Sequence, residues 1–387
     1  MLADSLKRLE DRCPCDCTEV RTFNIPGESR RLQYRPCLKI SGTSEVFFMF
    51  IPVTRLVGHS ADVTKARISP NMDSITTVSA DKTVCIWDSL TGKPLRFFAS
   101  HGKEVTDCVY HGSSYGVFTS CLDGVCRLFD LRNSSSNPAL TFSKGADSED
   151  QLTCVTAGHN VNSPLVVAGS MTGRIRFYDI RSSSVCVSAF AHYNCVTSVD
   201  TSPDDSMIVS ASLDTTMRVW SAYKGDCLVS YNNGNSNPSP CVYAGFTADN
   251  EGVIGLFLDS SIQRMHLSDR LYPRTKMSFG PRISTSTKTY TRIDSHGGIA
   301  VPSEDGSVFF IGSSSDGAGK FIQKPIKAHA DDCLSVDCRG DLLVSTGAGE
   351  DSSAVVWVRR TDGSAIMASN QYKLSYNLVS PQIEGLI

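Results

Sequence analysis

One repeated spacing constrains this chain more than any other feature. A turn-forming residue, usually aspartate, stands six residues before a large apolar or aromatic residue, and this pair recurs along the chain. The seven pairs are Asp81 with Trp87, Asp123 with Phe129, Thr172 with Tyr178, Asp214 with Trp220, Asp259 with Met265, Asp305 with Ile311 and Asp351 with Trp357. Consecutive pairs lie 42 to 49 residues apart (129 − 87 = 42; 178 − 129 = 49). This period is close to that of a four-stranded blade, so the sequence predicts an all-β, seven-bladed propeller.

Histidines repeat in the same register. Four of the eight histidines, His59, His101, His192 and His329, each lie 28 residues before the last residue of a pair. A histidine on the loop entering a blade can link the turn aspartate to a hydroxyl group and to the indole N–H. We therefore expect structural tetrads in blades 1, 4 and 7. Their residues are His59, Ser79, Asp81 and Trp87; His192, Ser212, Asp214 and Trp220; and His329, Asp351 and Trp357.

The grouping of histidine, aspartate and serine could also indicate a catalytic triad. We reject that interpretation, because the pattern repeats around a ring with a tryptophan partner and no nucleophile motif such as G-x-S-x-G accompanies it. The other blades lack a full set. Phe129 in blade 2 has no side-chain N–H to donate, and blades 3, 5 and 6 lack a histidine at the repeat offset. Those blades are expected to depend mainly on packing and to open more easily.

Composition narrows the class of protein. The 387-residue chain has a net charge of −3 and 15 cysteines. It has no apolar run of about 18 residues and no secretory signal pattern, so we expect a cytoplasmic or nuclear protein with reduced thiols. The cluster Cys13, Cys15 and Cys17 does not have the pair spacing of a zinc site. We therefore expect no metal, no cofactor and no small-molecule substrate.

A closed propeller must join its first and last blades. The strand-like run Phe48–Val57 precedes His59 and is predicted to be the outer strand of the last blade. The expected organisation is a mostly irregular N-terminal extension at 1–44, the propeller at 45–361 and a C-terminal tail at 362–387. Because Met49 begins that closing strand, translation starting there is a further hypothesis.

Several strings resemble a known superfamily. The segment Asp81-Lys-Thr-Val-Cys-Ile-Trp-Asp88 and the segments Ala168–Arg181 and Ser210–Trp220 resemble WD repeats. In the order of the blades and in their amino-acid sequence, blades 1 to 4 are most similar to the mitogen-activated protein kinase organizer family of WD-repeat proteins. That resemblance implies a non-catalytic scaffold for kinase-cascade or spliceosomal components, monomeric within a complex. The alternative resemblance is to the propeller subunit of histone methyltransferase complexes, whose central pocket grips an arginine.

Propellers commonly bind partners around the mouth of the central channel. The residues expected there are Thr64, Thr106, Thr153, Thr197, Thr291 and Leu334 on the first strands, and Ala80, Leu122, Met171 and Leu213 before the turns. This mouth is small-residue and mildly apolar, without the aromatic cage that an arginine pocket needs. The alternative interpretation is that the threonines are ordinary β-formers.

A second candidate surface is the basic segment between blades 5 and 6. Residues 264–292 contain seven Lys or Arg and one acid, Asp269, with Arg274, Lys276 and Arg282 at its centre. Such a patch could attract an acidic protein surface or RNA phosphates. Solvated charge on an outer strand is the commoner case, and the overall acidity of the chain argues against general nucleic-acid binding.

Overall fold

The computed structural model describes residues 21–23, 32–34, 49–112, 115–142, 150–182, 184–232, 238–247, 250–267, 275–278, 292–293, 298–313, 319–321 and 325–360. Contacts divide the chain into two units, Met1–Val46 and Phe47–Ile387. In the first unit, β1 (Arg21–Phe23) pairs antiparallel with β2 (Leu32–Tyr34). The predicted tail at 362–387 lies outside the described residues. No helix in the described ranges has the length and apolar character needed to cross a membrane.

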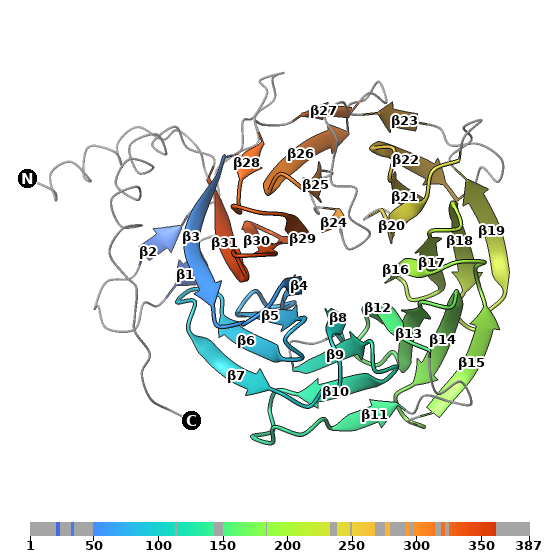
Figure 1. Ribbon diagram of the computed structural model, residues 1–387, viewed down its shortest axis with the longest axis horizontal. Helices are drawn as coiled ribbons and strands as arrows, with labels where there is room; N and C mark the ends of the chain where they lie inside the picture. The colour runs from blue at the N-terminus through green and yellow to red at the C-terminus, as the bar shows by residue number, and fades with distance from the viewer. Residues whose placement is uncertain are drawn as a thin grey trace, which may run out of the picture. The chain divides into compact units, whose positions relative to one another are not determined.

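The second unit contains seven antiparallel sheets arranged radially around a central axis (Figure 1). The strands of the first four blades, from the axis outward, are as follows. Blade 1 has β4 (Val63–Ile68), β5 (Ser74–Ser79), β6 (Val84–Asp88) and β7 (Pro94–Phe98); blade 2 has β8 (Val105–Tyr110), β9 (Gly116–Cys121), β10 (Cys126–Asp130) and β11 (Leu140–Phe142); blade 3 has β12 (Leu152–Ala157), β13 (Leu165–Ser170), β14 (Arg174–Asp179) and β15 (Ser184–Phe190); and blade 4 has β16 (Val196–Thr201), β17 (Met207–Ser212), β18 (Thr216–Ser221) and β19 (Cys227–Asn232).

The remaining three blades complete the ring. Blade 5 has β20 (Cys241–Phe246), β21 (Gly252–Phe257), β22 (Ser261–His266) and β23 (Thr275–Ser278); blade 6 has β24 (Arg292–Ile293), β25 (Gly298–Pro302), β26 (Ser307–Ser313), β27 (Gly319–Phe321) and β28 (Ile326–Lys327); and blade 7 has β29 (Cys333–Arg339), β30 (Leu342–Gly347), β31 (Ser353–Arg360) and β3 (Met49–Val57). The apolar residue of each sequence pair lies on the third strand of its blade, so the predicted seven-bladed architecture is confirmed.

An N-terminal strand closes the ring, as the sequence predicts. Strand β3 pairs antiparallel with β31, from Met49 opposite Arg360 to Val57 opposite Ser353. Both ends of the propeller chain therefore share one sheet (Figure 1). Such closure removes an open edge between the first and last blades, which would otherwise expose unpaired backbone groups.

The core is divided among the interfaces between blades. Each of the seven neighbouring pairs of blades shares an apolar cluster among the described residues. Between blades 6 and 7, for example, the rings of Phe50 and Phe310 stack with centroids 4.9 Å apart. Interior strands such as β5 are buried along their whole length because both faces of the sheet are covered by neighbours. Each fully buried large aliphatic or aromatic side chain contributes about 1.5–3 kcal/mol.

Candidate functional site

The two ends of the channel differ in the loops that surround them. Because the strands of a blade are antiparallel, the loop entering the innermost strand and the turn between the second and third strands lie at the same end. Hydrogen bonds join them: Ser60 N donates to Asp81 Oδ2 at 3.0 Å, and Tyr193 N donates to Asp214 Oδ2 at 3.1 Å. We call this end the loop face; it is the face where the sequence predicts partner contacts.

Histidine, aspartate and tryptophan form continuous hydrogen-bonded chains in blades 1, 4 and 7. In blade 4, Trp220 Nε1 donates to Ser210 Oγ at 2.8 Å, the same hydroxyl contacts His192 Nε2 at 2.7 Å, and His192 Nδ1 contacts Asp214 Oδ2 at 2.9 Å. Burial lowers the pKa of His192. Burial alone would raise the pKa of Asp214, but hydrogen bonds from His192 and Thr216 hold it well below its usual value.

The hydroxyl residue of the tetrad was predicted wrongly. In blade 1 the hydroxyl that contacts His59 and Trp87 belongs to Thr77, at 2.8 Å from each, and not to Ser79. Ser79 donates instead to Ala61 O and accepts from Asp81 N. The register explains the error: Trp87 lies opposite Ile75, so its indole reaches the diagonal neighbour on the same face of the sheet, Thr77.

The other two blades follow the same rule. In blade 4 the hydroxyl belongs to Ser210, two residues before the predicted Ser212, whose own hydroxyl donates to Asn194 O. In blade 7, Ser345 takes this place: its hydroxyl lies 2.9 Å from His329 Nε2 and accepts from Trp357 Nε1 at 3.0 Å. His329 Nδ1 lies 3.0 Å from Asp351 Oδ2.

In blade 2, Phe129 stands at the position of the tryptophan, and an arginine joins the histidine to the turn aspartate instead. Arg127 donates to both carboxylate oxygens of Asp123, at 2.8 and 3.2 Å, and its Nη1 lies 3.0 Å from His101 Nδ1. Because a guanidinium only donates, His101 Nδ1 must accept, and Nε2 donates to Thr119 Oγ1 at 3.2 Å. Burial and the charge of Arg127 lower the pKa of His101 to about 4. Blade 2 therefore has a buried polar network in addition to its packing, which the sequence analysis did not predict.

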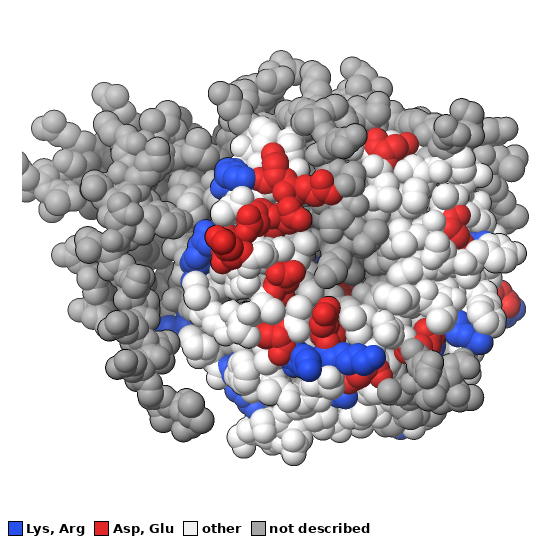
Figure 2. Space-filling view, viewed as in Figure 1, with Lys and Arg blue, Asp and Glu red and all other residues white. Residues whose placement is uncertain are grey.

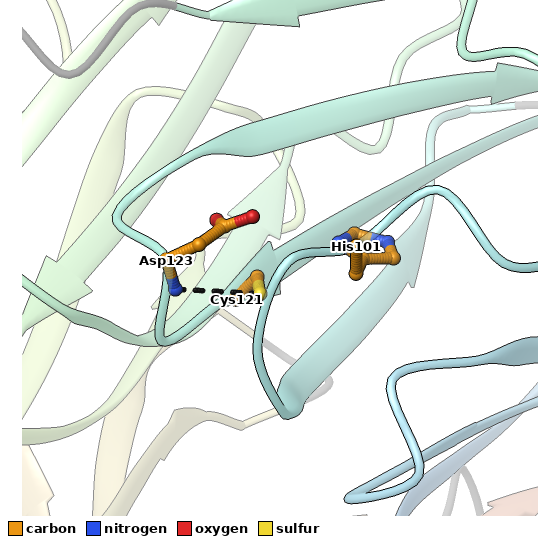
Figure 3. A group of neighbouring side chains, drawn as sticks. All are labelled: His101, Cys121 and Asp123. Carbon is orange, nitrogen blue, oxygen red and sulfur yellow. Dashed lines mark hydrogen bonds between the residues drawn. The ribbon is translucent and has the colours of Figure 1, made fainter.

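The same corner of blade 2 brings together His101, Cys121 and Asp123 (Figure 3). Their ligand atoms lie within 4.8 Å of one another, which raises the question of a metal ion. The donors are already engaged: Arg127 binds Asp123 and His101, and Cys121 Sγ donates to Lys103 O. Burial raises the pKa of the Cys121 thiol to about 11, whereas a metal requires the thiolate. This group fits an arginine-centred tetrad better than a metal site.

Blade 3 also has a buried polar group that the sequence expectation missed. Arg176 Nη2 donates to Asp150 Oδ2 at 2.8 Å, and the side chains are each only 2% exposed. Thr172, the turn residue of this blade, donates to Asp150 Oδ1 at 2.8 Å. Asp150 stands 28 residues before Tyr178 (178 − 150 = 28), the offset at which blades 1, 2, 4 and 7 carry a histidine. Blade 3 therefore has a buried ion pair in addition to its packing.

Four of the predicted mouth threonines link neighbouring blades. Each hydroxyl donates to the first backbone carbonyl of the next innermost strand. The bonds are Thr64 to Val105 O at 2.7 Å, Thr106 to Leu152 O at 3.0 Å, Thr153 to Val196 O at 2.5 Å and Thr197 to Cys241 O at 2.8 Å. These hydroxyls bond within the ring, and the predicted role of the threonines in partner contact stays a prediction.

Ion pairs link innermost strands deeper in the channel. Lys65 Nζ in blade 1 lies 3.6 Å from Asp107 in blade 2, and Arg67 lies 3.5 Å from Asp337 in blade 7. Burial lowers the pKa of Lys65 to about 7, although Asp107 opposes this. Asp337 also accepts from Ile68 N across the blade boundary at 2.8 Å. These charges therefore hold adjacent blades in register.

A cavity of about 410 Å³ lies at the other end of the channel, lined by first-turn residues such as Pro70, Gly112, His159, Pro203 and Gly340. Its described charges have internal partners: Arg67 donates to Cys108 O, and Asp200 accepts from Phe246 N. The described lining shows no paired acid and base aimed at one point.

The remaining predicted mouth residues vary in accessibility. Met171 is 49% exposed, Ala80, Leu122 and Leu213 are half-buried, and Leu334 is only 3% exposed, so Leu334 cannot offer a contact surface. Thr291, Arg274 and Arg282 lie outside the described residues. Lys276 lies in β23 with its backbone opposite Gln263, and its side chain is outside the described set.

The loop face also carries exposed and half-exposed groups that the sequence reasoning missed. Acidic side chains gather over blade 7 and its neighbours (Figure 2), and we call Asp62, Glu304, Asp331, Asp332 and Glu350 the acidic sector. Burial and the charges of Glu304, Asp331 and Asp62 raise the pKa of Asp332. Over blades 3 and 4 the exposed groups are aromatic instead: Phe190 is 70% exposed and Tyr193 is 95% exposed. The signal available in the sequence was the position of these residues close to the repeat histidines, as for Tyr193 after His192, or next to the turn aspartates, as for Glu350 before Asp351.

Comparison with known proteins agrees with this architecture. Residues 50–88, 92–130 and 184–221 match the family described as WD domain, G-beta repeat. Similar proteins include "Guanine nucleotide-binding protein subunit beta" from Zea mays, 25% identical over 43% of this chain and 46% of its own length. "Striatin-4" from Homo sapiens is 28% identical over 45% of this chain and 23% of its own length. "Transcriptional corepressor LEUNIG_HOMOLOG" from Arabidopsis thaliana is 28% identical over 46% and 22%, respectively.

These alignments span less than half the length of each named relative. They indicate no enzyme family, and WD-repeat propellers generally act as scaffolds for protein interactions. None of the relatives named above is a mitogen-activated protein kinase organizer. The resemblance to that family therefore rests only on the sequence segments given in the sequence analysis. The chain contains WD40 repeats and folds as a seven-bladed WD-repeat β-propeller.

Proposed function

We propose that this propeller is a non-catalytic scaffold that assembles protein components of a signalling or pre-mRNA-splicing complex in the cytoplasm or nucleus. The observation that supports it best is that the loop face has two kinds of side chain, those bonded within the ring and those that point outward. The repeat polar groups form hydrogen bonds within and between the blades, whereas the outward side chains include exposed aromatic groups over blades 3 and 4 and acidic groups over blade 7. Aromatic and arginine side chains supply most binding energy at protein interfaces.

The histidine–aspartate pairs offer no catalytic alternative. The side chains of His59, His192 and His329 are 2%, 0% and 0% exposed, respectively. A general base must come within hydrogen-bond distance of the proton that it removes, and these imidazoles have no surface to offer a substrate. Each is also bonded at both ring nitrogens within its blade. The tetrads therefore support a structural role.

The choice among partner classes needs a direct experiment. The tagged chain would be purified from cells under mild conditions and its stoichiometric partners identified by mass spectrometry. Kinases or splicing factors that dissociate from one another when the chain is depleted, and reassociate when it is restored, would support the proposal. Histone methyltransferase subunits would favour the alternative propeller role. Recovery of the chain alone, with turnover of a small molecule, would refute both scaffold proposals.

A further inference from the structure

Blades 3 and 4 share an exposed aromatic surface on the loop face. The loop 191–194 crosses the turn 171–173 of blade 3, because the N–H groups of Ala191 and His192 both donate to Gly173 O, at 3.0 and 2.9 Å. This crossing brings the side chains that flank the loop and the turn to one part of the face. Met171, Phe190 and Tyr193 are 49%, 70% and 95% exposed, respectively. Large apolar groups gathered at one place on a surface mark a contact site more often than scattered ones do.

Two arginines accompany these rings. The guanidinium carbon of Arg174 lies 3.7 Å from the ring centroid of Phe190, and that of Arg218 lies 6.0 Å from the ring centroid of Tyr193. Stacking on an aromatic face fixes the orientation of the Arg174 guanidinium. Arg218 is also oriented by a hydrogen bond from its Nε to Thr216 Oγ1 at 3.4 Å. We call Met171, Arg174, Phe190, Tyr193 and Arg218 the aromatic–arginine platform.

The charge of this platform differs from that of the acidic sector. The two neighbouring acids are turned inward: Asp150 binds Arg176 inside blade 3, and Asp214 binds His192 inside blade 4. Their carboxylates are 2% and 6% exposed. The platform therefore shows positive charge beside apolar rings, whereas the opposite part of the same face carries acids (Figure 2). An acidic ligand is attracted to the platform and repelled from the acidic sector.

We propose that the aromatic–arginine platform binds an acidic segment of a partner protein that carries an aromatic or long aliphatic side chain. The apolar side chain packs on Tyr193, Phe190 and Met171, and neighbouring carboxylates accept hydrogen bonds from Arg174 and Arg218. The acidic sector fixes the direction of the segment, because its negative residues are disfavoured over blade 7. This inference rests on the proposed scaffold function and adds the chemistry of one partner.

Fluorescence anisotropy with defined peptides tests the proposal on the full chain. The probe is a fluorescein-labelled 12-residue peptide of glutamates with two phenylalanines; matched peptides replace the glutamates by glutamine or lysine. The acidic probe is expected to bind most tightly and to weaken with added salt. Tyr193→Ala is expected to weaken it about tenfold, and Arg218→Gln about three- to tenfold.

Matched controls come from the opposite end of the blades. Tyr223 is 84% exposed in the turn after β18, and Arg181, 75% exposed, is paired with Asp179 in the turn after β14. Tyr223→Ala and Arg181→Gln are expected to leave the affinity unchanged. Equal binding of the lysine peptide, equal losses in the controls, or preferential binding of a 12-nucleotide oligouridine over the acidic peptide would each overturn the proposal.

The failure of this inference can be distinguished from the failure of the scaffold function. If Tyr193→Ala and Arg218→Gln retain every partner that the wild type recovers from cells, the platform is not the contact site although the scaffold function stands. If the wild type recovers no stoichiometric partner, the scaffold function fails whatever the peptide result. Circular dichroism and urea unfolding of each variant establish that a loss of binding does not reflect loss of the fold.

Discussion

Replacing Arg127 by methionine tests the arginine-centred tetrad of blade 2. Methionine keeps much of the side-chain length but removes the bidentate contact with Asp123 and the bond to His101. Both members of the ion pair are only 12% exposed. Breaking a buried pair on one side costs about 3–5 kcal/mol. Asp123 keeps backbone bonds from Gly102 and Val125, so we expect about 3 kcal/mol.

Hydrogen–deuterium exchange followed by mass spectrometry measures this loss of stability in blade 2 itself. A loss of about 3 kcal/mol corresponds to roughly 150-fold faster exchange in the peptides covering β9 and β10. The exposed pair Arg132–Asp130 in the same blade supplies the control, since its arginine side chain is 69% exposed. Arg132→Met is expected to leave exchange unchanged. An acceleration below about fivefold for Arg127→Met would show that packing alone holds blade 2.

The same substitution has an independent spectroscopic readout. The positive charge of Arg127 is, after burial, the main cause that lowers the pKa of His101. Without it, the ring faces the carboxylate of Asp123 and can donate from Nδ1, as His59 does in blade 1. We therefore expect the pKa of His101 to rise in Arg127→Met, measured by NMR titration of the imidazole. An unchanged pKa would contradict the contact geometry.

Three further predictions concern stability, measured by urea unfolding followed through tryptophan fluorescence. Ser210→Ala is expected to cost about 2 kcal/mol because it removes the hydroxyl shared by the histidine and the indole, whereas Ser212→Ala should cost about 1 kcal/mol; equal costs would contradict the tetrad correction. Thr197→Val is expected to cost about 1 kcal/mol without changing peptide affinity, and a change in affinity alone would support its predicted contact role. His101 has a folded pKa of about 4, below its ordinary 6.5, so the unfolded chain binds the proton at higher pH than the folded protein does. The contribution of His101 to the free energy of unfolding is therefore complete above pH 6.5, and it falls by about 3 kcal/mol as the pH drops to 4. His101→Gln should remove that part of the pH dependence, and an identical slope in both proteins would count against it.

The blade count, the blade anchors and the closing strand could be predicted from the sequence. These features are local: each blade repeats one order of strands and turns, and the fixed offset from Asp81 to Trp87 reports that order directly. The closing strand followed from the same reasoning, since the last blade would otherwise lack an outer strand beside β31. The alternation of apolar residues and the spacing between repeats can both be seen in the sequence without knowledge of the fold.

The tertiary structure decided which groups actually meet. The choice of Thr77 over Ser79 depends on the cross-strand diagonal, which spacing alone does not show. In blade 2, Arg127 joins the histidine to the turn aspartate. In blade 3, Asp150 stands at the histidine offset and pairs with Arg176, and neither contact has a counterpart in the repeat motif. Sequence offsets identify equivalent positions, but hydrogen bonds depend on side-chain reach, and different residue types can satisfy the same buried carboxylate.

The composition of the loop face is the feature that the sequence pattern predicted least. Its acidic sector joins Asp62 to Glu304 and to Asp331, and the threonine bonds join strands more than 40 residues apart. Closure of the ring brings these residues together, so their neighbours cannot be read from the linear order. The sequence alone therefore determined how many sheets form and in what order, because backbone pairing follows local periodicity. Only the closed ring decided which exposed side chains share a surface, because that depends on distances across the axis.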